Sequence, residues 1–323
     1  VPDREDGDDD RTDHERGSRA DRLASDGTIA APFHVSFSSG HDTASDGCRN
    51  RSCADTYRKH ISVDSTPAVV RAVLFTSEEP LYLPRYLRPI LASHADAIDR
   101  VVVAPFDTPP AEQVRGQFGM YGPRAGTRLA MRYLRGTLLD ALPGRLGWQL
   151  AGRPHSVEAV ARRYDVPFER VSDVTDSEFV ERVERLDPDL LLSIVAGQRL
   201  SAELLDCATD AVNLHGSLLP AYRGRATAFW PLYYGDDRTG VTAHRMTEQF
   251  DAGPILTRRP VPIEPMDTVD SIYRKLASAG ATLAVDLLDR YPDLPPETPN
   301  ETVAADYHGL PGPAERREFR DRG

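Results

Sequence analysis

Three polar side chains that could catalyse acyl transfer occur in two short segments of the chain. The first segment, residues 211–224, reads AVNLHGSLLPAYRG and begins as the end of a strand, so Asn213 and His215 point to one side. The second reads FDAGPI and places a lone carboxylate, Asp251, just before a Gly-Pro turn. An amide, an imidazole and a carboxylate can together polarise a carbonyl, move a proton and hold the charge of the imidazole. These are the groups that acyl transfer to an amine requires.

Each of these residues has a more ordinary interpretation when it is taken alone. A strand-end asparagine usually makes a turn, a histidine in a strand is usually a hydrogen-bonded core residue, and an aspartate before glycine usually belongs to a turn. Their joint occurrence favours catalytic roles instead. Asn213 would donate to the oxygen that gains charge, His215 would move the proton, and Asp251 would hold the imidazole.

Three further residues of the two segments are candidates for supporting roles. Ser217 continues the alternation of Asn213 and His215, and we expect its hydroxyl to fix the loop by bonding the backbone. His244 lies two residues after Thr242, on the same face of a predicted strand, and would orient Asp251 or its loop. Arg223 could meet an anion of the substrate or form a structural ion pair, and the sequence favours neither.

The two segments together resemble the 10-formyltetrahydrofolate-dependent formyltransferases, a superfamily with methionyl-tRNA, glycinamide-ribonucleotide and sugar-amine formyltransferases among its members. The resemblance couples N-x-H-x-S-x-L-P-x-Y-R-G, beginning at Asn213, to T-x-H at 242–244 and D-x-G at 251–253. It runs from about residue 69 to about residue 291 and is strongest at 189–263. It implies that Asn213, His215 and Asp251 are the catalytic residues.

The same resemblance implies how the formyl donor, 10-formyltetrahydrofolate, is bound, and it implies no metal. In the family the donor lies against a loop that matches Gln198, Arg199 and Leu200. Backbone near the loop that begins at Glu248 holds the pterin. The expected donor-binding residues are therefore Gln198, Arg199, Leu200, Glu248, Gln249 and Phe250.

The order of apolar segments predicts an α/β fold with a doubly wound, mostly parallel sheet. A buried strand is expected at 69–76, and the continuous apolar run at 189–195 is typical of a strand that helices cover on both faces. Late strands are expected at 240–246 and 254–263, followed by a helix at 268–290. The resemblance adds that these late strands are antiparallel in a Rossmann-like formyltransferase fold. Ligands of such sheets bind beyond the carboxyl ends of the strands, where Asn213 would lie.

Composition divides the chain into three parts. Residues 1–66 hold acidic runs and no periodic apolar face, so we expect a disordered or non-native extension. Residues 67–291 would form the catalytic domain. Residues 292–323, rich in Pro, Glu and Arg, are expected to be loose.

The overall composition is that of an acidic enzyme without membrane spans. The net charge of −11 disfavours general nucleic-acid binding, and 40% hydrophobic residues suffice for a core. No run approaches the ~20 apolar residues of a membrane helix, and no secretory signal is recognisable. Three cysteines without metal-ligand spacing suggest a reducing compartment, so a cytoplasmic location is expected.

An insertion at about 106–153 contrasts with the acidic remainder. Between residues 113 and 156 it carries seven arginines against a single acid, Asp140; the arginines are Arg115, Arg124, Arg128, Arg132, Arg135, Arg145 and Arg153. This positive patch could receive a nucleotide diphosphate, contact an anionic membrane surface or bind nucleic acid. It could equally be a solvated helical lid.

The expected function is formyl transfer to a primary amine of a small acceptor that is phosphorylated or nucleotide-linked. The transfer-RNA enzymes of the family carry an added basic domain, and only about thirty residues follow residue 291 here, so tRNA is not the expected partner. Two alternatives stay open: tRNA formylation that uses the arginine-rich insertion, and a folate-binding relative without catalysis.

Overall fold

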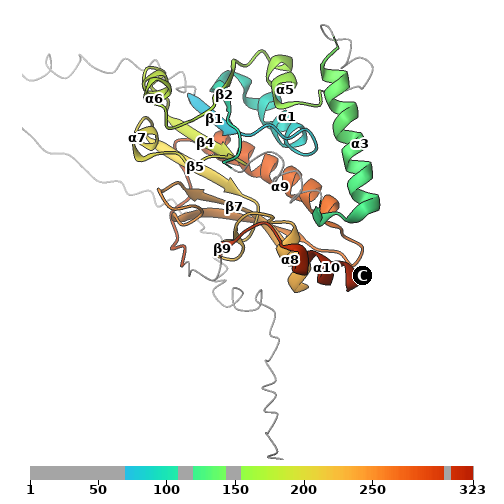
Figure 1. Ribbon diagram of the computed structural model, residues 1–323. Coiled ribbons are helices and arrows are strands. Elements are labelled where there is room, and N and C mark those ends of the chain that lie inside the picture. Colours follow the sequence, from blue (N-terminus) through green and yellow to red (C-terminus); the bar gives the residue numbers. More distant parts are fainter. Residues whose placement is uncertain (1–69, 108–118, 143–153, 302–306, 323) are drawn as a thin grey trace, which may run out of the picture. The chain divides into compact units, whose positions relative to one another are not determined.

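The computed structural model describes residues 70–107, 119–142, 154–301 and 307–322 (Figure 1). The predicted extension at 1–66 and both ends of the arginine-rich insertion lie outside these ranges. The domain boundaries expected from the sequence therefore stay predictions. None of the helices in the described ranges is long and apolar enough to cross a membrane.

A seven-stranded sheet with the order β3-β2-β1-β4-β5-β7-β8 forms the centre of the fold. The first five strands pair in parallel, and β7 and β8 are antiparallel to their neighbours. The strands are β1 (Ala72–Thr76), β2 (Ile98–Val103), β3 (Phe168–Arg170), β4 (Leu190–Ile194), β5 (Asp210–His215), β7 (Arg238–Arg245) and β8 (Ile255–Pro262). This topology confirms the predicted mostly parallel α/β sheet with late antiparallel strands.

Helices cover both faces of the sheet (Figure 1), which is why β1 and β4 are apolar at nearly every position. Leu74 and Leu192 share one core with four helices, while Phe75 and Leu191 share a second core with two others. The first four helices are α1 (Leu83–His94), α5 (Val157–Arg163), α8 (Phe229–Tyr234) and α9 (Val269–Arg290), and the other two are α6 (Ser177–Glu184) and α7 (Ala202–Leu205).

Local side-chain caps fix where several of these helices begin. The side chain of Asp176 accepts the backbone N–H of Phe179 at 3.1 Å at the start of α6. Thr268 and Ser271 form a reciprocal capping box at the start of α9. These polar residues precede apolar periodic segments, so the helices at 176–186 and 268–290 were predictable from the sequence.

The described centre of the arginine-rich insertion is the helix α3 (Gly122–Asp140). Its arginines Arg124, Arg128 and Arg135 are exposed, and Arg132 forms an ion pair with Asp270 of α9 at 3.2 Å. Its exposed side chains also include the apolar residues Met131, Tyr133, Leu134 and Leu138. Both the positive charge and the apolar surface expected of the insertion are therefore present on this helix.

The expectation of a loose C-terminal tail was wrong for residues 307–322. These residues form the short strand β9 (Tyr307–His308), which pairs in parallel with β6 (Arg223–Gly224), and the helix α10 (Pro313–Asp321). The ring of Phe319 in α10 lies 4.9 Å from that of the fully buried Phe229. The aromatic helix α8 (Phe229–Tyr234) supplies the surface on which α10 packs. The Pro-, Glu- and Arg-rich composition of the tail gave no sign of this packing.

Candidate active site

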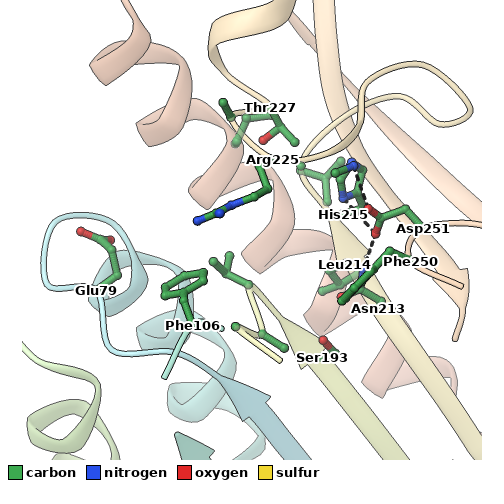
Figure 2. A pocket seen from close by; sticks show the side chains of 18 of the residues that line it. Glu79, Phe106, Ser193, Asn213, Leu214, His215, Arg225, Thr227, Phe250 and Asp251 are labelled. Atoms are coloured by element: carbon green, nitrogen blue, oxygen red, sulfur yellow. Dashed lines mark hydrogen bonds and ion pairs between the residues drawn. The ribbon is translucent and has the colours of Figure 1, made fainter. Parts of the chain in front are cut away.

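A connected network of polar side chains lies at the carboxyl end of β5 (Figure 2). Asp251, in the loop between β7 and β8, is its centre. Oδ1 of Asp251 lies 3.2 Å from Nδ1 of His215 and accepts from Nδ2 of Asn213 at 3.3 Å. The second amide proton of Asn213 is directed to Nε2 of His244 at 3.0 Å. The structure thus brings together the three residues expected to be catalytic, with His244 as a fourth member.

The two hydrogen bonds of His215 favour its protonated, cationic form. Nδ1 faces the Asp251 carboxylate, and Nε2 faces the carbonyl oxygen of Tyr222 at 2.9 Å. Both neighbours only accept hydrogen bonds, so the ring satisfies both contacts only when both of its nitrogens carry protons. Burial opposes the charge, but the carboxylate and the two hydrogen bonds outweigh it and raise the pKa of His215 above its ordinary value.

The Asp251 carboxylate stays ionised although it is buried. Burial alone would raise its pKa, but the charge and hydrogen bond of His215 lower the pKa well below the usual range of a carboxyl. Oδ2 also accepts the backbone N–H of Gly224 at 2.9 Å. The backbone of Asp251 has a φ of 51°, a left-handed conformation that is uncommon for a residue with a side chain.

His244 determines the orientation of the Asn213 amide. Nδ1 of His244 donates to the carbonyl of Arg245 at 2.8 Å, so its Nε2 is left to accept from Asn213. The sheet explains this contact, because Asn213 and His244 are directly opposite in the antiparallel β5–β7 pair. His244 was expected to support Asp251 or its loop. Its Nε2 lies 3.6 Å from Oδ1 of Asp251, and the direct bond to Asn213 is an additional contact.

A cavity of about 430 Å³ opens beside this network. Of the residues expected to bind the donor, it is lined by Gln198, Arg199, Leu200, Gln249 and Phe250. Glu248 is not part of the wall; its carbonyl oxygen accepts from the Arg199 side chain at 3.2 Å. The side chain of Gln198 bonds the backbone of Ser172 and Val174, so it braces the neighbouring loop.

Ser217 and Arg223 lie outside the cavity wall and hold the surrounding loops. The hydroxyl of Ser217 donates to the carbonyl of Ala221 at 2.7 Å, a backbone contact of the kind expected for it. The guanidinium of Arg223 donates to the carbonyl of Phe250 at 2.7 Å. Arg223 therefore fastens the loop of Asp251 to the turn that follows β5.

Sequence reasoning missed a second group of cavity residues. Arg225 extends into the space between Phe106 and the His215–Asp251 pair, and its guanidinium lies 6.0 Å from the centre of the Phe106 ring (Figure 2). Its position directly after Arg223-Gly224 is a signal that could have found it. Tyr82, Tyr121 and Tyr273 come from three helical regions far apart in sequence, and no local pattern connects them.

Glu79 is the partly buried carboxylate of this second group. It accepts the backbone N–H groups of Leu81 and Tyr82, each at 2.7 Å, and of Leu83 at 3.3 Å, so it caps the start of α1. Burial raises its pKa to about 7 although these three N–H groups oppose the shift. Glu79 and Arg225 place one acid and one base on the cavity wall away from the catalytic network.

The described arginines of α3 do not line the cavity; Met120 and Tyr121, at the start of the helix, do. Arg199 and Arg225 are thus the arginines of the cavity wall in the described part of the chain. A direct contact between the α3 arginines and a ligand in this cavity has no support from the geometry.

Residues 142–288 match the family model described as formyl transferase, and all three candidate catalytic residues lie in this range. This segment of the chain belongs to the formyl transferase family. The superfamily that the two motifs resembled is thereby confirmed, and the chain is an enzyme of the formyltransferase class.

Several solved structures resemble the chain at low identity. A sugar N-formyltransferase from Shewanella is 17% identical, with 77% of this chain and 86% of that chain covered and a TM-score of 0.48. An N-formyltransferase from Helicobacter canadensis, in complex with folinic acid and dTDP-3-aminofucose, is 17% identical, with 74% and 70% covered and a TM-score of 0.47. A glycinamide ribonucleotide transformylase from Symbiobacterium toebii is 18% identical, with 68% and 86% covered and a TM-score of 0.45. At these TM-scores the likenesses do not identify the substrate of this chain.

Proposed function

We propose that this enzyme transfers the formyl group of 10-formyltetrahydrofolate to a primary amine of a small acceptor that is phosphorylated or nucleotide-linked. The observation that carries the proposal is the charged His215–Asp251 pair beside the Asn213 amide, on the wall of a cavity and within the segment that matches the formyl transferase family. The proposal assigns the catalytic roles to these three residues.

The geometry suggests how the three would share the work. The His215 cation would stabilise negative charge on the formyl oxygen as the amine attacks. The Asn213 amide proton that now faces Asp251 would turn to the same oxygen, while the other stays on His244. Nε2–H of His215, now on the Tyr222 carbonyl, is also the proton that could be passed to the departing nitrogen, and the neutral ring would then take up the proton that the attacking amine loses. Asp251 would keep the ring oriented and favour its charged form before and after this exchange. His244 would keep the Asn213 amide turned toward the cavity side of the network.

The cavity wall beside Asp251 fits a flat heterocyclic donor. Leu200, Met246 and Phe250 supply apolar surface there, and the side chain of Phe250 is 46% exposed. Arg199 and Arg223 hold the carbonyls of Glu248 and Phe250, so this loop is fixed before any ligand arrives. The donor would supply the formyl carbonyl and the nitrogen that leaves it.

The acceptor would occupy the opposite part of the cavity. Arg225 is the cation placed there to receive a phosphate or diphosphate group. Glu79 and the hydroxyls of Tyr82, Tyr121 and Tyr273 would suit the hydroxyl groups of a sugar ring, and their rings supply flat surface. A nucleotide-linked amino sugar combines these features.

The test is an assay of the full chain with 10-formyltetrahydrofolate and a panel of amines, in which the absorbance of the released folate is followed. The panel should contain nucleotide-linked amino sugars, an amino sugar phosphate, an unphosphorylated amino sugar and charged initiator tRNA. We expect turnover with a phosphorylated small amine and its loss in Asp251→Asn. Formylation of the tRNA alone would replace the acceptor assignment. Folate binding without turnover of any amine would favour the non-catalytic alternative.

A further inference from the structure

The segment that follows α9 reaches the loop of Asp251 through the side chain of Asn300. Nδ2 of Asn300 donates to the carbonyl oxygens of Asp251 and Gly253, both at 3.0 Å. Both partners are acceptors, so the amide nitrogen must face them, and both of its protons are used. Beside it, Thr298 exchanges backbone hydrogen bonds with Ile255, at 2.8 and 2.9 Å, which fixes the segment against the first residue of β8.

The loop held by Asn300 is one that needs external support. Asp251 has the left-handed φ of 51°, which costs free energy for a residue with a side chain. Gly253 is packed so closely that a Cβ there would lie 2.0 Å from the carbonyl oxygen of Arg245. The two carbonyls that accept from Asn300 flank this tight turn. One side chain therefore fixes the direction from which the Asp251 carboxylate enters the site.

The same segment also supports Asp251 from the side of its carboxylate. β9 pairs with β6, and the backbone N–H of Arg225 donates to the carbonyl of His308 at 2.7 Å. A Cβ at Gly224 would lie 2.5 Å from that carbonyl, so the strands are in close contact. Gly224 is the residue whose N–H binds Oδ2 of Asp251. Farther along, Tyr307 and Leu310 line the cavity itself.

We infer that described residues after α9, which lie beyond the residues matched by the family model, are part of the active site, namely Asn300, Tyr307, His308 and Leu310. Among them Asn300 is a positioning residue that fixes Asp251 through its backbone. This inference rests on the proposed function of the site. Asn300 acts through Asp251 on His215 and touches neither substrate. β9 makes the corresponding contribution through Gly224, and Tyr307 and Leu310 complete the wall of the cavity.

The test compares Asn300→Ala with the control Thr298→Val in the full chain. The control removes one side-chain hydrogen bond, to the carbonyl of Ile255 at 3.1 Å, from the same segment without touching Asp251. The first readout is the pKa of His215, measured by NMR of the labelled imidazole. The charged groups that face His215 are Asp251 and Arg223, and both variants retain them. The second readout is kcat and KM for formyl transfer.

We expect Asn300→Ala to move the pKa of His215 down toward its ordinary value and to lower kcat by about tenfold or more, because both hydrogen bonds that hold the Asp251 loop are lost. KM for the formyl donor should change by less than about twofold, since the donor wall is untouched. Asn300→Asp should be worse than Asn300→Ala, because its carboxylate would face two carbonyl oxygens. Thr298→Val should leave the pKa and kcat unchanged.

Two outcomes would overturn the inference. One is an Asn300→Ala protein with the wild-type pKa of His215 and wild-type kcat, whatever its melting temperature. The other is Asn300→Asp behaving as wild type. Failure of the proposed function looks different: no amine would be formylated by the wild-type chain, yet the NMR pKa of His215 in the three variants would still report on the positioning by Asn300.

Discussion

Asn213 and His244 are directly opposite each other on the antiparallel strands β5 and β7, and their side chains meet at 3.0 Å. The contact leaves the second amide proton of Asn213 for Asp251, so one cross-strand pair sets the direction of the amide dipole. Nδ1 of His244 donates to the carbonyl of Arg245, which holds the ring in place and leaves Nε2 as the acceptor for Asn213.

His244→Ala should therefore impair catalysis through Asn213. Without its acceptor the amide can rotate away, and we expect kcat to fall by about 10²-fold, comparable to the loss of an oxyanion donor. His244→Gln, whose carbonyl can accept from Asn213, should restore part of the rate. Steady-state kinetics of the two variants, with KM for the donor as the control, measure this. Equal rates for both variants would contradict the orienting role.

The pKa shifts of His215 and Asp251 predict a pH dependence of stability. The pKa of His215 is raised on folding, so its contribution is fully present below the unfolded value of about 6.5 and is lost as pH rises through the folded pKa. The pKa of Asp251 is lowered, so its contribution is present above the unfolded value of about 3.9 and is lost as pH falls toward the folded pKa. The free energy of unfolding from urea titrations at several pH values tests both.

The control for that experiment is Asp251→Asn. The neutral amide cannot stabilise the His215 cation, so the loss of stability above neutral pH should largely disappear and the pKa of His215 should fall. If the variant keeps the wild-type slope of stability against pH in both ranges, other groups dominate and the pair does not carry the effect.

Replacement of Arg225 should affect the acceptor alone. Arg225→Ala removes the cation between Phe106 and the catalytic network, so we expect KM for a phosphorylated acceptor to rise by about tenfold or more, the value of a charge-assisted contact. KM for the donor should be unchanged. Arg238→Ala, an arginine whose partner Asp237 is its chain neighbour, is the matched control. An equal rise of KM for donor and acceptor would show a general distortion instead.

The exposed face of α3 predicts binding to an anionic membrane surface. Arg124, Arg128 and Arg135 are exposed, as are the apolar side chains of Met131, Leu134 and Leu138. Replacing the three arginines by serine should abolish sedimentation with phosphatidylserine vesicles while leaving the acceptor KM unchanged, because α3 arginines do not line the cavity. If the wild-type protein does not sediment with the vesicles at low salt, the predicted membrane binding is wrong. If the KM for the acceptor rises in the triple-serine variant, these arginines bind the acceptor instead.

The docking of α10 should contribute measurably to stability. Phe319 packs on Phe229 and is partly buried, so Phe319→Ala should lower the free energy of unfolding by about 1–2 kcal/mol. The exposed Arg317→Ala in the same helix is the control and should have little effect. Chemical denaturation of both variants measures the difference, and an unchanged midpoint for Phe319→Ala would mean that α10 is not stably docked.

The sequence by itself determined the mostly parallel sheet and which three residues are the candidates for catalysis. The strands β1 and β4 can be predicted because a strand covered on both faces must be apolar at almost every position. Asn213 and His215 can be recognised because they are close in sequence and alternate on one strand. Asp251 can be recognised because it is a lone carboxylate before a Gly-Pro turn.

Only the tertiary structure decided which hydrogen bonds these residues form and which residues line the cavity opposite them. The register of β5 against β7 places His244 on Asn213, and no local pattern specifies a pairing across 31 positions. Asn300 reaches Asp251, and Arg225 with the tyrosines forms the second wall, only after helices distant in sequence have packed on the sheet. Such contacts depend on long-range burial of apolar surface, here the cores shared by α1, α9 and the sheet, and that burial has no periodic signature near the residues it brings together.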